Sequence, residues 1–528
     1  MASRAAPAPA SRTEPSPAAP GDVATLPVRH HGLLTLAVMM ASIMQILDTT
    51  IANVALPHME SSLGATSETV TWALTSYLVA SAIAIPITGW LAERIGSRNL
   101  FIWAVIAFTL SSLLCGAATS LGEMVLFRAF QGISAAFIGP LSQTVLMDIN
   151  PPSKQAKAMA LWGMGIMVGP IMGPVIGGWL TENYNWRWVF LINVPLGIVT
   201  VILMLWLLPS RPKTDRRFDL FGFSMLALGL ASMQVMLDRG TQLDWLSSTE
   251  ILIEGAIAIA CLWMFALHML WGRQPLFDRT LLGNPNMAAA LLFMLVVGMV
   301  MFASMALLPP MLQQLFGYTV LDTGLLLAPR GFGILVSMAI AGRLVTRIDP
   351  RYLMVTGAII TTYSLYMMTG WSLEMSWQPM VVAGLVQGLG MGLVFIPLNM
   401  TAFSTLQPRH RTDGASLLNL SRSIGASIGI AGMTALLSRN IQVSHGDLAA
   451  HITDSTLSAI DSGTIEKFGS LGDATMMAIN GEVNRQAAMI AYIDDFHAMM
   501  LINLCAIPLL LLLRRPANMG GLPVHIGE

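Results

Sequence analysis

The chain has 528 residues, of which 55% are hydrophobic and 11% are charged, and its formal net charge is -1. A soluble globular domain carries about 25% charged residues, so this composition excludes an ordinary soluble protein, and the small net charge gives no general attraction to nucleic acid. No GxxxxGK[ST] phosphate loop and no HExxH zinc motif occurs, which argues against ATP hydrolysis and zinc-protease chemistry on this chain.

Residues 1–31 are rich in Ala, Pro and Ser and predict a disordered cytoplasmic tail. Apolar runs of about 20 residues follow, each long enough for a helix that crosses a bilayer. We place fourteen such spans at residues 32–55, 69–91, 99–119, 122–146, 157–181, 188–208, 218–237, 250–270, 286–312, 322–345, 352–371, 379–404, 412–437 and 492–513. The sequence therefore predicts an all-α integral membrane protein.

The first span contains a carboxylate. On a helix, Asp48 shares one face with Gln45, Thr49, Ala52 and Asn53, because neighbours three, four and seven residues apart align. A charged side chain at the centre of a membrane helix costs roughly 2.5–3.5 kcal/mol, so it usually faces the protein interior. We predict that Asp48 is a proton or cation site in a transport pathway, and the alternative is a carboxylate held by a structural partner.

The fourth and fifth spans carry two further patterns. Polar and small residues, Arg128, Gln131 and Gln143 among them, fall on one side of the fourth span. In the fifth span glycines recur every four residues, with prolines between them: Gly165, Gly169, Pro170, Gly173, Pro174 and Gly177. Small residues at this spacing let two helices approach closely, and proline removes backbone hydrogen bonds. We therefore expect a tightly packed face on the fifth span.

The distribution of Lys and Arg predicts the orientation. If the N-terminus lies in the cytoplasm, the external side holds five of the 28 Lys and Arg residues: Arg187, Arg239, Arg439, Lys467 and Arg485. Three lie within spans (Arg128, Arg330 and Arg422), and the remaining 20 fall on the cytoplasmic side. Cytoplasmic loops are enriched in Lys and Arg, so both termini are expected in the cytoplasm.

The chain also repeats itself. Residues 89–100 align with residues 342–353, and Gln131-Gly132 aligns with Gln387-Gly388, at offsets of about 253 and 256. Both copies have the same orientation. The repeat predicts two six-helix halves, at residues 32–208 and 286–515, separated by two extra helices within 209–285 and followed by a cytoplasmic tail at 516–528.

Several motifs resemble those of a known family. Residues 47–57 (Leu-Asp-Thr-Thr-Ile-Ala-Asn-Val-Ala-Leu-Pro) resemble the first-span signature of the fourteen-span drug:proton antiporters of the major facilitator superfamily. Residues 89–98, 128–132 and 165–178 resemble the superfamily's loop motif, fourth-span motif and antiporter motif. Three further stretches resemble the EmrB/QacA type of this family, and EmrB in particular: residues 186–197, 237–245 and 313–319.

The resemblance covers about residues 32–515 and implies the major facilitator fold with helices arranged as 6+2+6. It implies proton coupling through Asp48 and Arg128, although Arg128 could instead bind backbone carbonyls. It implies a bendable packing face at the glycines of the fifth span, and a charge latch between the halves, against the alternative of simple charge anchoring, at Gly89, Glu93, Arg94, Gly96 and Arg98. Glu93 stands where the family usually has Asp, and Ser97-Arg98 where it has a basic pair.

The remaining polar residues of the spans predict a substrate cavity between the halves. We assign to it Gln45, Thr49, Asn53, Gln131, Gln143, Asn399, Asn419 and Arg422. For Asn399, Asn419 and Arg422 the alternative is internal hydrogen bonding. The 38 methionines include some that could line a promiscuous cavity, although most are expected as apolar filler. We leave Arg330 unassigned and expect Glu254 to be an interfacial or structural acid.

Residues 439–491 are predicted to form the only long external connector, with a helix-like stretch at 474–491. The resemblance implies an EmrA-like periplasmic membrane-fusion adaptor and a TolC-like outer-membrane channel as partners, and this loop is a candidate docking site or a structural cap.

We therefore predict a multi-pass exporter of the bacterial inner membrane, not an enzyme. It would expel lipophilic, often cationic, toxic compounds in exchange for protons, with no cofactor, no metal and no nucleic-acid partner. The alternative is a dedicated exporter or importer of one metabolite, lipid or siderophore on the same fold.

Overall fold

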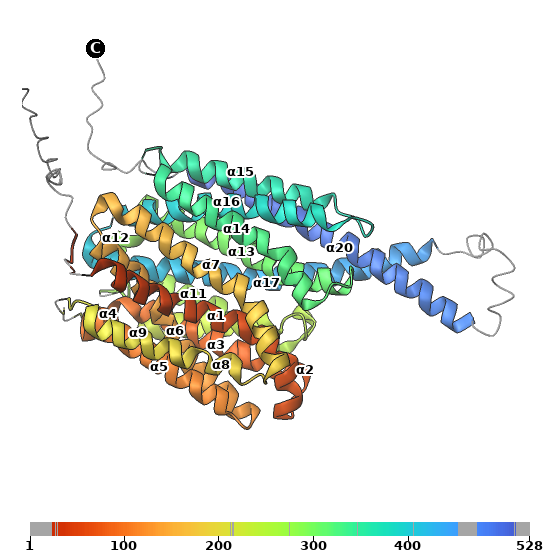
Figure 1. Cartoon of the computed structure of the whole chain (residues 1–528), viewed down its shortest axis with the longest axis horizontal. Coiled ribbons are helices and arrows are strands. Elements are labelled where there is room, and N and C mark those ends of the chain that lie inside the picture. The colour runs from red at the N-terminus through yellow and green to blue at the C-terminus, as the bar shows by residue number, and fades with distance from the viewer. Residues whose placement is uncertain are drawn as a thin grey trace, which may run out of the picture.

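The computed structural model describes residues 24–26, 28, 30–211, 213, 216–273, 275–345, 347–404, 406–451, 472–511 and 513. These residues form α-helices and three short 3-10 segments, with no β-strand among them (Figure 1). Most of the two predicted terminal tails, and residues 452–471 of the predicted external connector, lie outside the described residues.

The N-terminal half consists of α1 (His31–Leu63), α2 (Ser67–Val70), α3 (Trp72–Ala84), η1 (Ile85–Ile87), α4 (Thr88–Ile95), α5 (Ser97–Ala117), α6 (Leu121–Ile149), α7 (Pro152–Asn183), α8 (Trp188–Leu191) and α9 (Asn193–Leu207). The linker contains α10 (Leu220–Arg239), η2 (Trp245–Ser247), α11 (Thr249–Trp271) and α12 (Arg279–Leu282). The C-terminal half consists of α13 (Pro285–Gln314), α14 (Val320–Leu344), α15 (Pro350–Thr369), α16 (Trp377–Ser404), η3 (Pro408–His410), α17 (Arg411–Ala450) and α20 (Gly472–Leu511).

The all-helical membrane architecture agrees with the prediction. In the described part of the chain, 13 helices are long and apolar enough to cross a membrane. The predicted span that is not among them is α15, a helix of 20 residues with several polar side chains, which packs against α16 and α20. The count of fourteen spans therefore stays a prediction.

The two halves repeat the same packing. In the first half α1 packs on α7, and α3 and α5 pack on α6; in the second half α13 packs on α17, and α14 and α15 pack on α16. The repeated packing includes individual glycines at equivalent positions in the two halves. A Cβ added at Gly132 would lie 2.3 Å from the carbonyl oxygen of Tyr77, and one at Gly388 would lie 2.0 Å from that of Arg330. Only glycine permits these two backbone approaches, so the sequence repeat at Gln-Gly has a structural cause.

The extra helices lie against both halves. α10 packs against α3 and α17, while α11 packs on α10. The hydroxyl of Thr75 on α3 donates to Asp238 of α10, and the hydroxyl of Ser427 on α17 donates to Gln234 of α10 at 2.6 Å. The helix that links the halves along the chain therefore also bridges them in space.

Three of the predicted spans, the second, thirteenth and fourteenth, differ clearly from those expected. The second predicted span is interrupted at η1, because Pro86 has no backbone N–H to continue the α-helical pattern. The last two spans are longer than expected, since α17 continues to Ala450 and α20 begins at Gly472. These two helices project together beyond the rest of the bundle, and they are joined by a 2.9 Å contact between His445 and Asn480 (Figure 1). The described part of the predicted connector at 439–491 is thus mostly helical.

We call the end of the bundle that carries the turn at Gly96 and the start of α17 the inner end, which is the predicted cytoplasmic side. The opposite end, from which α17 and α20 project, is called the outer end.

Candidate transport site

The predicted coupling residues Asp48 and Arg128 form a buried ion pair. Arg128 Nη1 lies 2.6 Å from Asp48 Oδ2, and the side chains are 1% and 0% exposed. Gln131 donates from Nε2 to Asp48 Oδ1 at 2.9 Å, and Asn193 donates from Nδ2 to the same oxygen at 2.8 Å. Both carboxylate oxygens therefore accept hydrogen bonds, as a buried charge requires.

The guanidinium of Arg128 is held from several sides. It donates from Nε to the carbonyl oxygen of Ala73 at 3.0 Å and from Nη1 to Gln131 Oε1 at 2.7 Å. Its Cζ lies 4.4 Å from the ring centroid of Tyr77 and 5.5 Å from that of Phe190, distances at which a cation is attracted to the ring face. Arg128 thus pairs with the carboxylate and also binds a backbone carbonyl, contacts that are compatible with both the coupling role and the structural role.

Asn193 was not among the predicted site residues. Its Nδ2 also donates to Ser112 Oγ at 3.0 Å, and Ser112 donates to the carbonyl oxygen of Phe190 at 2.9 Å, so the amide is fixed from behind. The signal in the sequence was an asparagine in an otherwise apolar run. Which helix it would face depends on the packing of α9 against α1 and α5.

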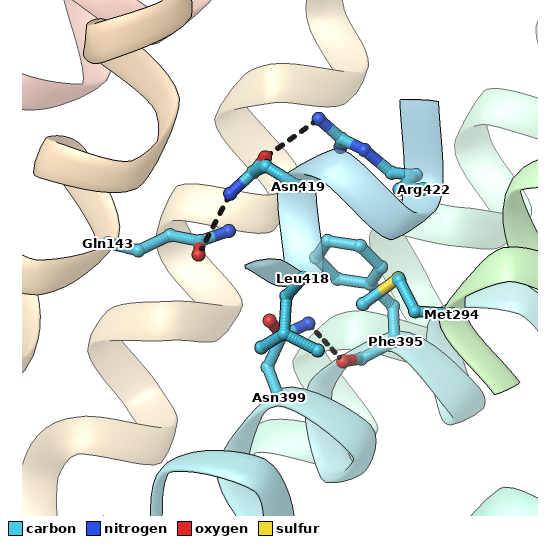
Figure 2. Close-up of a pocket in the computed structure, with 7 residues that line it drawn as sticks. All are labelled: Gln143, Met294, Phe395, Asn399, Leu418, Asn419 and Arg422. Atoms are coloured by element: carbon cyan, nitrogen blue, oxygen red, sulfur yellow. Dashed lines mark hydrogen bonds between the residues drawn. The ribbon is translucent and has the colours of Figure 1, made fainter. Parts of the chain in front are cut away.

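Four of the predicted cavity residues lie together between the halves. Gln143 of α6, Asn399 of α16, and Asn419 and Arg422 of α17 line a narrow pocket, together with Met294, Phe395 and Leu418, and in this structure the pocket has no room for a water molecule (Figure 2). Asn419 donates to Gln143 Oε1 at 3.3 Å across the boundary between the halves. Arg422 donates to Asn419 Oδ1 at 3.0 Å, and Asn399 donates to the carbonyl oxygen of Phe395 at 2.8 Å.

The other four predicted cavity residues lie apart from that pocket's lining. Gln45 is the nearest of them, because a Cβ added at Gly139 would lie 3.8 Å from Gln45 Oε1 and 3.4 Å from Asn419 Oδ1. Thr49 donates to the carbonyl oxygen of Ile46 in its own helix at 2.7 Å, and Asn53 is exposed. Gln131 belongs to the Asp48 ion pair instead.

The residues of the predicted latch lie at the inner end, where an arginine from the linker joins them. Arg216 Nη1 lies 2.9 Å from Asp413 Oδ2 of α17 and 3.7 Å from Glu93 Oε2 of α4. Gly89 faces Asp413 directly, and Arg98 donates to the carbonyl oxygen of Leu205 at 2.8 Å. Arg94 lies in the last turn of α4, and Gly96, with φ of 94°, makes the turn to α5. Arg216 and Asp413 were not part of the predicted latch.

A second ion cluster also joins the halves at the inner end. Asp148, at the end of α6, contacts Arg411 Nη1 of α17 at 3.0 Å and Arg211 of the linker. Burial, and then the charge of Arg411, lower the pKa of Arg211 to about 10. The hydroxyl of Ser416 also donates to the carbonyl oxygen of Ile85, next to the Pro86 interruption. The inner ends of the halves are therefore held together in this structure.

The fifth-span glycines face α1. Added Cβ atoms would lie 2.6 Å from Met39 at Gly165, 2.7 Å from Ile46 at Gly169, 2.2 Å from Thr50 at Gly173 and 3.1 Å from Ile51 at Gly177. Pro170 and Pro174 lie inside α7, which remains one helix from Pro152 to Asn183. The glycines thus bring α7 close to the helix that carries Asp48.

A metal site is not indicated among the described residues, where no group of three His, Cys, Asp or Glu side chains could hold a metal ion.

Comparison with known proteins agrees with this architecture. The model of the Major Facilitator Superfamily matches residues 38–438. The chain is 37% identical to the multidrug export protein EmrB of Escherichia coli K12 over 80% of its length and 83% of that protein. It is 33% identical to the fatty acid resistance protein FarB of Neisseria gonorrhoeae over 92% of its length and 97% of that protein.

Among solved structures, the human organic anion transporter MFSD10 superposes with a TM-score of 0.57 over 90% of this chain and the whole of that one, at 12% sequence identity. At that identity the likeness concerns the fold. Together with the sequence matches, the repeated halves and the polar pocket between them, it establishes that the chain belongs to the Major Facilitator Superfamily and, within it, to the family of the multidrug export protein EmrB.

Proposed function

We propose that this protein exports apolar toxic compounds of several kinds across the bacterial inner membrane in exchange for protons. The observation that carries the proposal is the buried pair of Asp48 and Arg128, in a fold whose two repeated halves have a separate polar pocket between them. The names of relatives from Escherichia coli, a multidrug export protein and a probable multidrug resistance protein, support the substrate class.

In the coupling step a proton competes with Arg128 and two amide donors for the Asp48 carboxylate. An ionised Asp48 binds Arg128 and two amides, whereas a proton on the carboxylate removes the charge that holds these donors. A proton entering from the outer side would therefore loosen α1 from α6 and α9 and favour the return of the empty transporter. The membrane potential adds about 2.3 kcal/mol per charge per 100 mV to this step.

The charge of the pocket bears on which compounds bind. Arg422 is the one charged side chain among its seven lining residues. A partly buried cation without an acid beside it favours a neutral or anionic apolar compound, so cations are expected to bind there less well than the sequence suggested. The name of the relative FarB keeps a dedicated exporter of one lipid-like acid as the second candidate.

The distribution of Lys and Arg supports a cytoplasmic location for both termini. The resemblance to EmrB-type exporters makes the projecting parts of α17 and α20 the candidate docking surface for an EmrA-like adaptor, which would lead to a TolC-like outer-membrane channel. No cofactor is invoked, since the proton gradient supplies the energy.

The test uses inverted vesicles energised with a proton gradient and a panel of anionic, neutral and cationic apolar compounds. Substrate-induced proton release is expected from the wild type and is expected to be lost in Asp48→Asn. Glu482→Gln is the matched control, because it removes an exposed carboxylate that pairs with Arg485 far from the site. Release that persists in Asp48→Asn would exclude coupling through Asp48, and a response to a single metabolite alone would favour the dedicated exporter.

A further inference from the structure

Asp495 is a buried carboxylate that the coupling step above does not use. It lies in α20, inside the membrane-spanning part of the helix, and its exposed fraction is 0%. The residues on the same face one turn away, Tyr492 and Met499, are buried too. The next residue, Phe496, packs edge-on against Trp371 with ring centroids 5.5 Å apart. Asp495 therefore lies in an apolar part of the C-terminal half.

Neither carboxylate oxygen of Asp495 has a hydrogen-bond partner among the described residues. The other deeply buried aspartates differ, since Asp48, Asp148 and Asp413 each contact an arginine. The preceding residue provides an internal comparison. Asp494 is exposed and accepts a hydrogen bond from Asn440 of α17 at 3.2 Å. Two adjacent carboxylates of one helix thus have opposite surroundings.

The helices packed against α20 do not bring a cation to Asp495. α20 packs on α13, α15 and α17, and α13 has no titratable side chain. On α15 the tyrosines are exposed and Arg351 lies at the inner end, while Glu374, just beyond α15, is also exposed. On α17, Arg439 is exposed and Arg422 donates to Asn419. The remaining titratable groups of α17 lie at its inner end (Arg411 and Asp413) or beyond the bundle (His445 and Asp447).

An ionised carboxylate without partner or water is strongly disfavoured in apolar surroundings, so the side chain takes up a proton instead. It can release that proton only when the helices around α20 separate and admit water. In a protein whose halves change their packing, such a group binds a proton in one conformation and loses it in another.

We propose that Asp495 is a second proton-binding site, located in the C-terminal half and separate from the Asp48–Arg128 pair. Its ligand is a proton taken from water at the outer end, where the neighbouring Asp494 is exposed. The extension to transport rests on the proposed function. If both carboxylates change protonation once per cycle, the exporter moves one proton through each half.

The first experiment needs no substrate. Infrared difference spectra of the purified full-length protein at neutral pH are compared between the wild type and Asp495→Asn, Asp495→Glu and Asp494→Asn. The carbonyl band of a protonated, buried carboxylic acid is expected in the wild type, absent from that position in Asp495→Asn, shifted in Asp495→Glu and unchanged in Asp494→Asn. An unchanged band in Asp495→Asn would show that Asp495 is ionised, and the proposal would be wrong.

The second experiment tests coupling in proteoliposomes, with dodecanoate and ethidium as probes and the number of protons per probe molecule as the readout. Asp495→Asn is expected to lower this number roughly two-fold while probe binding persists, since one of the two carboxylates that would each carry a proton per cycle is removed. An unchanged number would limit Asp495 to a protonated structural group. If the wild type transports neither probe, the proposed function fails on its own, and the infrared result still decides whether Asp495 binds a proton.

Discussion

Gly89 of the N-terminal half leaves the space that the Asp413 carboxylate of the C-terminal half occupies. A Cβ added at Gly89 would lie 1.6 Å from Asp413 Oδ1, so any other residue at this position would displace the Asp413 carboxylate. Because Asp413 is also bound by Arg216, this single contact links α4, the linker and α17 at the inner end.

Gly89→Val is expected to open the inner end. The reporter is a cysteine at Leu418, a pocket residue, labelled in inverted vesicles by a maleimide that does not cross the membrane. A change of about 1.4 kcal/mol in the balance between closed and open forms would raise the labelling rate about ten-fold. Gly122→Val is the control, because a Cβ added there has no atom within 4 Å. Equal labelling of both variants would argue against a latch at Gly89.

Gly173→Ala is expected to destabilise the contact of α7 with α1. The new Cβ would lie 2.2 Å from Thr50 Oγ1, and overpacking of this kind costs about 1–3 kcal/mol. Gly178→Ala, on the same helix, places its Cβ in open space and should be neutral or stabilise by about 0.5–1 kcal/mol. Thermal unfolding in detergent measures both. A similar melting temperature for the two variants would contradict the close approach.

Arg128→Met is expected to destabilise the protein strongly, because it leaves Asp48 buried without its counter-charge, at a cost of about 3–5 kcal/mol. Adding Asp48→Asn should restore much of the stability but not the proton release, since the carboxylate is still missing. The exposed pair of Glu482 and Arg485 is the control, and its removal should change the free energy of unfolding by less than about 1 kcal/mol. Additive effects of the two buried substitutions would be evidence against their interaction.

Arg422→Met is expected to weaken the binding of anionic compounds selectively. A hydrogen bond to a charged group contributes about 1.5–3 kcal/mol, which corresponds to roughly a 10- to 150-fold loss of affinity. Dodecanoate and its methyl ester form a matched pair, because they differ in charge and share the apolar chain. Equal losses for the two in a binding titration would mean that Arg422 acts through the shape of the pocket and not through its charge.

Much of the fold could be predicted from local patterns in the sequence. The apolar runs determine which segments become membrane helices, because a bilayer accepts a backbone only when its polar groups are bonded within the segment. The repeat at Gln131-Gly132 and Gln387-Gly388 predicted two similar halves, and the polar stripe of the first span predicted that Asp48 faces the protein interior. These are local properties, read from spacing and composition.

The partners of those residues depend on the tertiary structure. Asn193 lies 145 positions from Asp48 and Arg216 lies 197 positions from Asp413, and the pattern around each does not indicate which helix it will face. The rotation of each helix is set by packing such as that of Gly173 against Thr50, and this decides that Gln131 joins the ion pair while Gln143 lines the pocket. Sequence periodicity places a side chain on a face of its own helix, whereas close packing between distant segments decides what that face meets.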